Sequence, residues 1–356
     1  MSWLLCLAAI ALAFIASWTI IPAPAIWLVA ISVGGAELSP LFLIASVITG
    51  ALAWHVGGTP HRYSVALTLM AAAIFAVPFV RYPSAAPLSI RRLVSGLEDT
   101  HARITRGVSV TGAATSLTLD IYQPTSPGPH PVLVQIYGGA WQRGAPSDDG
   151  VFAATMADRG YVVFAIDYRH APGAIWPAQL DDVRASLAWI RVNGAGYGAD
   201  ASRMAVIGRS AGAELAMVAG FTDPGVRAVI SYYGPVDLAR GWREPPSPDP
   251  IGSRAVAETY LGGRPDQVAD RYAAASPLTH VSNHAPPTLL IYGARDHIVQ
   301  ARFGRTLHDA LIAAGASAQF VEIPWADHAF DAIPGGLSGQ VSLWHTERFL
   351  DENLRR

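Results

Sequence analysis

The sequence predicts an α/β protein with a mostly parallel sheet covered by helices on both faces, preceded by an all-α membrane-spanning region. The chain of 356 residues is 51% hydrophobic and only 15% charged, which is more apolar than an ordinary soluble domain. Its long apolar runs lie before residue 82. From about residue 100, short β-rich runs alternate with amphipathic helical stretches, a pattern typical of parallel sheets.

These patterns divide the chain into three parts. We expect residues 1–82 to form a transmembrane region of about three spans, 83–102 a linker, and 103–356 the α/β domain. The first apolar run, residues 3–21, is long enough to cross a bilayer at about 1.5 Å per residue. It lacks a basic segment at its start, so a membrane span is favoured over a cleaved signal peptide.

The second and third spans are expected at residues 25–54 and 63–80. The second stretch is interrupted by Gly34, Gly35, Glu37 and Pro40, and reads either as one long or broken helix or as a hairpin of two shorter pieces. Glu37 is either an intramembrane polar site or a residue at a kink, and we favour the kink. The positive-inside rule places the α/β domain in the cytoplasm, because more arginines flank the last span on that domain's side than on the other.

Within the α/β domain, the first two strands are expected to form an antiparallel pair at residues 103–110 and 116–123. The further strands are expected at residues 131–137, 161–168, 204–208, 227–232, 288–292 and 319–323. The helices are expected at residues 149–159, 179–192, 211–219, 301–314 and 342–350. Sheets of this kind bind ligands outside the carboxyl ends of their strands.

Several classes of function are disfavoured by composition and by missing motifs. The net charge of -2 does not favour nucleic-acid binding. The sequence shows no metal-ligand cluster, phosphate-binding loop or dinucleotide motif, so we expect no metal and no cofactor. Cys6 is the one cysteine, which excludes an intrachain disulfide.

The strongest chemical signal is the G-x-S-x-G pentapeptide from Gly208 to Gly212. It stands between a predicted strand and an Ala-rich helix, where the chain must turn sharply and small residues are needed. This turn would lift Ser210 to the N-terminus of the helix, whose dipole favours negative charge. The motif predicts a serine hydrolase with an α/β-hydrolase fold and Ser210 as its nucleophile.

Serine needs a base and a group that orients the base. The expected chain order of serine, acid and histidine selects Asp296, after the strand at 288–292, and His328, after the last strand. His297 precedes a helix and is expected to point elsewhere. Asp327 adjoins His328 in sequence and is therefore a poor partner for its ring. We assign Ser210, His328 and Asp296 as the catalytic triad.

The oxyanion formed during acyl transfer needs backbone donors placed in advance. We assign this role to the N–H groups of Gly139, Ala140 and Ala211. The first two lie in the Tyr-Gly-Gly-Ala-Trp segment that follows the strand at 131–137, where glycine lets the backbone approach a bound intermediate.

Residues 100–352 resemble the esterase/lipase family related to hormone-sensitive lipase, particularly its acetyl- and feruloyl-esterase-like carboxylesterases. The resemblance rests on the pentapeptide and on further segments at residues 137–141, 167–172, 176–178, 181–183, 260–263, 275–278 and 286–288. Tyr137 stands where the family has a histidine that is thought to brace the oxyanion loop. Arg209 replaces the commoner His or Asp, and Ala213 replaces a small glycine. The Pro- and Arg-rich residues 235–281 either shape the substrate pocket or form an ordinary surface loop.

The resemblance implies ester hydrolysis through an acyl-enzyme. We therefore expect a membrane-anchored serine carboxylesterase that acts on a small-molecule or lipid ester. A peptidase, amidase or acyltransferase could use the same triad. The alternative without enzymatic activity is an inactive hydrolase fold that serves as a membrane-tethered binding module.

Overall fold

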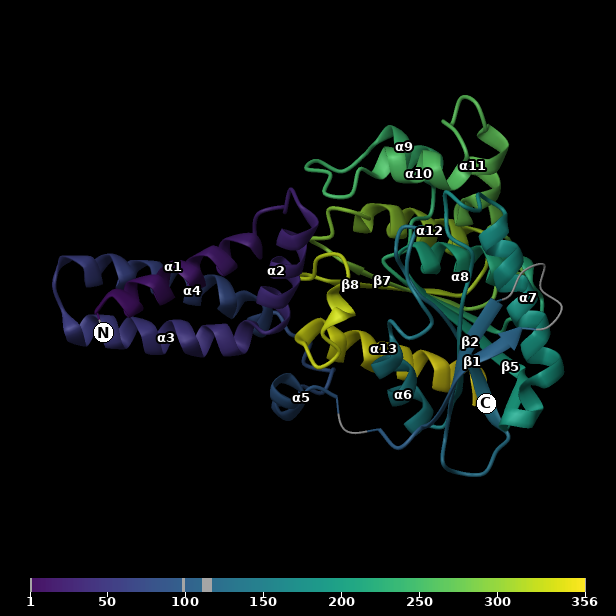
Figure 1. Cartoon of the computed structure of the whole chain (residues 1–356), viewed down its shortest axis with the longest axis horizontal. Helices are drawn as coiled ribbons and strands as arrows, with labels where there is room; N and C mark the ends of the chain where they lie inside the picture. The colour runs from purple at the N-terminus through teal and green to yellow at the C-terminus, as the bar shows by residue number, and fades with distance from the viewer. Residues whose placement is uncertain (1, 98–99, 111–116, 356) are drawn as a thin grey trace.

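The structure is a computed structural model that describes residues 2–97, 100–110 and 117–355. An α/β domain carries most of the chain, and a helical arm from the N-terminal region projects from one side of it (Figure 1). The predicted α/β architecture, a mostly parallel sheet with helices on both faces behind an N-terminal helical region, is confirmed.

The arm consists of helices α1 (Ser2–Trp18), α3 (Ser39–Val56) and α4 (Thr59–Val80), packed along one another. Gly57 and Gly58 join α3 to α4 with φ values of +70° and +89°, a conformation that favours glycine. Close packing within the pair also depends on a glycine: a Cβ at Gly50 would lie 2.7 Å from the Thr68 hydroxyl.

The second apolar stretch is broken into two helices. Helix α2 (Ile26–Glu37) has 12 residues and lies at the junction with the α/β domain, while α3 turns away into the arm (Figure 1). Among the described helices, α3 and α4 are long and apolar enough to cross a membrane, and α1 is slightly shorter. Of the interpretations of residues 25–54, an unbroken helix does not agree with the structure, which divides this stretch into two helices.

Glu37 lies at the end of α2, but its side chain reaches the α/β domain. Its Oε2 accepts hydrogen bonds from the backbone N–H groups of Ser338 at 2.6 Å and Gly339 at 3.4 Å. These groups belong to the first turn of the last helix, α13 (Leu337–Leu354), where backbone donors have no partner within the helix. Glu37 is fully buried and caps that helix, which neither sequence interpretation anticipated.

In the described part of the chain, the sheet has eight strands in the order β1-β2-β4-β3-β5-β6-β7-β8. Strands β1 and β2 pair antiparallel, β2 also pairs antiparallel with β4, and the remaining pairs are parallel. Ser116, the predicted start of the second strand, lies outside the described residues. The strands are β1 (Arg103–Val110), β2 (Leu117–Gln123), β3 (His130–Ile136), β4 (Val162–Ile166), β5 (Ala199–Arg209), β6 (Ala228–Tyr232), β7 (Thr288–Gly293) and β8 (Ala318–Ile323).

Helices cover both faces of the sheet. Helices α7 (Ala178–Asn193), α8 (Ala211–Thr222) and α12 (Ala301–Ala313) pack on one face, and α6 (Gly150–Asp158) and α13 on the other (Figure 1). Helix α13 begins five residues before its predicted start at 342 because Glu37 supplies its N-terminal cap. The short helix α5 (Ile90–Ser95) lies within the predicted linker, of which residues 98 and 99 are outside the described part of the chain.

The segment between β6 and β7 carries three short helices, α9 (Leu238–Arg243), α10 (Ser253–Leu261) and α11 (Ala269–Ala275). They lie over the carboxyl-end side of the sheet (Figure 1). The loops after β3, β5, β7 and β8 open at this same edge, so the residues singled out from the sequence converge there.

Candidate active site

Ser210 lies in the sharp turn between β5 and α8. Its φ of +50° and ψ of -119° are strained for a non-glycine residue, as expected at a nucleophile elbow. The two glycines of the motif are sterically required. A Cβ at Gly208 would lie 2.1 Å from the Gly212 carbonyl oxygen, and one at Gly212 would lie 2.2 Å from the Tyr137 carbonyl oxygen.

The structure brings Ser210, His328 and Asp296 into one hydrogen-bonded row. The Nε2 atom of His328 is 3.0 Å from the Ser210 Oγ, and its Nδ1 is 2.8 Å from Asp296 Oδ2. The other carboxylate oxygen of Asp296 accepts from the N–H groups of Ile298 at 2.9 Å and Val299 at 2.8 Å. These two bonds hold the carboxylate in place without help from any mobile side chain.

This geometry defines the protonation state that the site needs. An ionised carboxylate can only accept, so the Nδ1 of His328 donates to Asp296, and Nε2 is left to accept from the Ser210 hydroxyl. Burial of the imidazole ring opposes its protonation, but the negative charge of Asp296 outweighs this and raises the pKa of His328 above its ordinary 6.5.

The raised pKa predicts the pH dependence of the reaction. Protonated His328 cannot accept the serine proton, so kcat/KM for an ester should fall as the pH drops through a value above 6.5. In the Asp296→Asn variant the midpoint of this acid limb should move to lower pH, because the largest charge that opposes the effect of burial on the ring is then removed. A pH–rate profile of both proteins checks the shift, and an unchanged midpoint in the variant would contradict it.

The predicted oxyanion loop lies beside Ser210. Gly139 and Ala140 line a cavity together with Ser210 and His328, and Ala211 begins the helix that follows Ser210. The loop backbone is unusual, with φ values of +127° at Gly139 and +55° at Ala140. A Cβ at Gly139 would lie 2.0 Å from a neighbouring carbonyl oxygen, so this position requires glycine.

Tyr137 braces this loop in place of the family's histidine. Its hydroxyl donates to Asp167 at 2.5 Å and lies 2.9 Å from the Nε2 of His170. Its ring stacks on Tyr168 with centroids 4.5 Å apart, and the Tyr168 hydroxyl donates to the Tyr137 carbonyl at 3.2 Å. The substitution therefore keeps the start of the loop fixed by several contacts.

Glu214 supports the loop of Gly139 and Ala140 through the side chain of Trp141, and the sequence analysis did not identify it. It lies one helical turn after Ser210 and is fully buried. Its Oε2 accepts from the Trp141 indole N–H at 2.9 Å and from the Tyr260 hydroxyl at 3.0 Å, and the two rings stack 4.1 Å apart. Burial raises the pKa of Glu214 to about 8, so the carboxyl is mostly protonated at neutral pH. A lone acidic residue in an otherwise apolar helix was the signal that could have found it.

Replacing Glu214 tests its positioning role. Glu214→Ala leaves two buried donors without an acceptor, and we expect the free energy of unfolding to fall by about 2 to 4 kcal/mol and kcat to fall roughly 10- to 100-fold. Glu214→Gln keeps the acceptor and resembles the protonated acid, so it should restore most of both. Denaturation in detergent and ester kinetics measure the two effects. A glutamine variant as impaired as the alanine variant would contradict the assignment.

Arg209 ties the nucleophile turn to the loop that follows His328. Its guanidinium is buried, 2.5 Å from Asp331 and 3.4 Å from Asp149, and stands 4.5 Å above the Phe152 ring. The Asp331 carboxylate also accepts from Tyr233, whose ring packs against His328 with centroids 4.7 Å apart. The paired charges make Arg209 a positioning residue beside the site.

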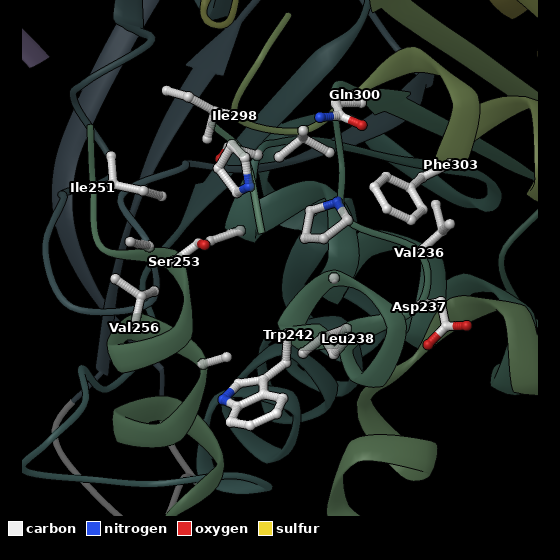
Figure 2. A pocket seen from close by; sticks show the side chains of 18 of the residues that line it. Val236, Asp237, Leu238, Trp242, Ile251, Ser253, Val256, Ile298, Gln300 and Phe303 are labelled. Carbon is white, nitrogen blue, oxygen red and sulfur yellow. The ribbon is translucent and has the colours of Figure 1, made fainter. Parts of the chain in front are cut away.

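A mainly apolar cavity opens at Ser210. It holds about 780 Å³ of space outside protein atoms, its open mouth included, and Ala140 and Ala211 line it next to Ser210. Side chains from the segment between β6 and β7, including Leu238, Trp242 and Val256, form much of its wall (Figure 2). The part of this segment at residues 235–257 therefore shapes the cavity, which agrees with the first of the two interpretations of residues 235–281.

The cavity suits an apolar organic group better than a metal ion. Within residues 2–97, 100–110 and 117–355, no group of three or more His, Cys, Asp or Glu side chains is arranged to hold a metal. The polar atoms that face the cavity beside Ser210 suit recognition of an ester, with apolar walls on either side.

Comparison with known proteins places these features in a family. Residues 119–311, more than half of the chain, match the BD-FAE family. The chain is similar to Esterase LipC of Mycobacterium tuberculosis, with 32% identity over 249 residues that cover 63% of this chain and 59% of that protein. It is also similar to the isoprenylcysteine alpha-carbonyl methylesterase ICME of Arabidopsis thaliana, with 25% identity over 256 residues covering 67% and 55%. The chain spans 50 to 59% of the lengths of the mycobacterial relatives LipC, LipQ and LipM.

Solved structures show the same fold. A truncated carbohydrate esterase from gut microbiota superposes with a TM-score of 0.63 at 25% identity, covering 73% of this chain and 99% of that chain. An esterase from the archaeon Pyrobaculum calidifontis superposes with a TM-score of 0.64 at 23% identity, covering 72% and 87%. With the fold, the elbow motif and the matched residues in agreement, the chain belongs to the BD-FAE family.

Proposed function

We propose that this chain is a membrane-anchored serine carboxylesterase that hydrolyses carboxylic esters through Ser210, His328 and Asp296. The observation that carries the proposal is the hydrogen-bonded row of these three side chains beside an apolar cavity. The esterase names of the relatives support the same chemistry.

The reaction proceeds in two halves. The Nε2 of His328 takes the Ser210 proton while Oγ bonds to the ester carbonyl carbon, and Asp296 stabilises the resulting imidazolium. His328 then returns the proton to the alcohol oxygen as its bond to carbon breaks, which leaves an acyl group on Ser210. A water molecule, deprotonated by His328, attacks this acyl-enzyme and releases the acid and the free serine.

The oxyanion of each tetrahedral intermediate is stabilised by backbone N–H groups of Gly139, Ala140 and Ala211. Donors of this kind are worth about 3 kcal/mol each in the transition state. Their rigid placement is supported by the contacts that Tyr137 and Glu214 make to the loop and its following tryptophan.

The arm is proposed to anchor the enzyme in a membrane. Helices α3 and α4 would extend about 27 and 33 Å, close to the thickness of the hydrocarbon core. Large apolar side chains point outward from them, with Leu52, Leu69 and Trp54 exposed by 51%, 66% and 78%. The arginines near the end of α4 support a cytoplasmic position for the α/β domain.

Hydrolysis of matched substrates tests the proposal. The purified full chain in detergent should hydrolyse p-nitrophenyl butyrate, and should act far more slowly on the matched butyryl p-nitroanilide, because the amide is the poorer acyl donor. Absence of ester turnover would contradict the esterase assignment. An anilide rate equal to the ester rate would instead favour an amidase.

A further inference from the structure

Helix α2 and the segment before it are joined to the loops that follow β7 and β8. The His297 ring reaches the Ala23 carbonyl through Nε2 at 3.0 Å and the Asp327 carboxylate through Nδ1 at 3.1 Å. Both partners are acceptors, so both ring nitrogens donate in this arrangement. Asp327 also accepts from the Ser32 hydroxyl at 3.1 Å and from the backbone N–H of His328 at 2.7 Å. The N-terminal region is thus held directly on the loop that carries the catalytic histidine.

Apolar packing reinforces this attachment. Ala23, Leu28, Val29 and Val33 form a buried cluster, and Ile298 from the loop after β7 packs against it. The cap that Glu37 provides to α13 fixes the other end of α2. Helix α2 therefore forms a wall at the edge of the α/β domain where Ser210 and His328 lie, with contacts along its whole length.

That wall reaches the mouth of the active site. Ile26, the first residue of α2, lines the same cavity as Ser210 and His328. Ile251 and Ile298 line this cavity and also the mainly apolar cavity that opens at Ser210. Charged residues, among them Arg143 and Asp148, line this cavity too, so Ile26, Ile251 and Ile298 are its large aliphatic side chains, which an acyl chain on its way to Ser210 would contact.

The outer surface of this wall is apolar as well. Ile20, Ile21 and Ile26 are each 48% exposed, and Trp27 is 60% exposed. This segment lies between α1 of the arm and α2 (Figure 1), and its residue Ile26 lines the cavity. Exposed isoleucine and tryptophan side chains at such a place are stabilised by contact with lipid at the membrane interface.

We propose that residues 20–27 form a membrane-facing lip of the catalytic cavity, and that the substrates are esters with long acyl chains that pass from the bilayer over Ile26 to Ser210. The inference rests on the proposed esterase function and adds the substrate class and its route of entry. The products would be a long-chain acid and an alcohol, with water as the second reactant.

The route of entry can be tested with the full chain reconstituted in phosphatidylcholine vesicles. p-Nitrophenyl palmitate is placed either in the bilayer that holds the enzyme or in separate enzyme-free vesicles mixed with it. Delivery from the bilayer predicts rapid hydrolysis in the first arrangement and loss of most of the initial rate in the second. Equal initial rates would mean that the ester arrives through water and would overturn the route.

The lip can be tested with a matched pair of substitutions. Ile26→Ser should lower the ratio of kcat/KM for p-nitrophenyl palmitate to that for p-nitrophenyl butyrate by roughly tenfold, and Ile26→Leu should restore the ratio. Ile44→Ser, at an isoleucine of α3 that is 57% exposed, should leave the ratio at the wild-type value. An unchanged ratio of the two kcat/KM values in Ile26→Ser would contradict the proposed lip.

These outcomes separate the inference from the function on which it rests. A wild-type enzyme that hydrolyses both esters, with activity lost in Ser210→Ala, retains the proposed function even if Ile26→Ser has no effect. A wild-type enzyme that hydrolyses neither ester loses the proposed function and the lip together.

Discussion

Ser210→Ala should lower kcat for p-nitrophenyl butyrate by roughly 10⁴- to 10⁶-fold, and His328→Ala should cause a loss of similar size. The serine oxygen forms the acyl bond, and without the imidazole 3.0 Å away it keeps its proton. The double variant should be no slower than either single variant, because each change already disables the same unit. Initial rates of all three proteins at saturating ester measure this.

Two exposed residues of the same types provide the controls. Ser202→Ala and His284→Ala change an exposed serine and an exposed histidine outside the site, and both should retain wild-type rates. Losses that multiply in the double variant would show that Ser210 and His328 act independently, which the hydrogen-bonded row does not allow.

Asp296→Asn should lower kcat by roughly 10³- to 10⁴-fold while leaving the fold intact. The asparagine side chain is nearly isosteric, but its amide group can donate to the Nδ1 of His328. That bond would favour the tautomer with the proton on Nε2, which can no longer accept from Ser210. Steady-state kinetics, with circular dichroism to verify folding, measure the loss.

Asp327→Asn is the matched control for this prediction. Asp327 is also buried near His328, but its Oδ1 accepts from that residue's backbone N–H, whereas Asp296 faces the ring. The asparagine oxygen can accept the same backbone bond, so kcat should fall far less than in Asp296→Asn. A larger loss of kcat in Asp327→Asn than in Asp296→Asn would contradict the assignment of the orienting role to Asp296.

The convergence of Ser210, His328 and Asp296, our proposed triad, could be predicted from the sequence because each of them follows a strand. A parallel sheet brings the carboxyl ends of its strands to one edge, so Asp296 after β7 and His328 after β8 converge on Ser210 after β5 without knowledge of any side-chain contact. Gly208 and Gly212 could be predicted for a similarly local reason, because the backbone of the turn leaves no room for a Cβ at either position.

The supporting contacts could not be predicted in this way. Glu214 accepts from the indole of Trp141 and the hydroxyl of Tyr260, and these three residues lie on three segments distant from one another in the chain. Glu37 finds its partner, the N-terminus of α13, about three hundred residues later in the sequence. An apolar run alone could not indicate that α2 would leave the arm and pack on the catalytic loops, because hydropathy is the same for lipid and for protein surroundings.

Labelling with a fluorophosphonate probe tests the central claim most directly. The probe reacts with a serine whose hydroxyl is activated by a base, so the full chain should gain one phosphonyl group, and peptide mapping by mass spectrometry should place it on Ser210. Labelling should vanish in Ser210→Ala. A folded protein that never reacts, or that reacts at another residue while hydrolysing esters, would contradict the account.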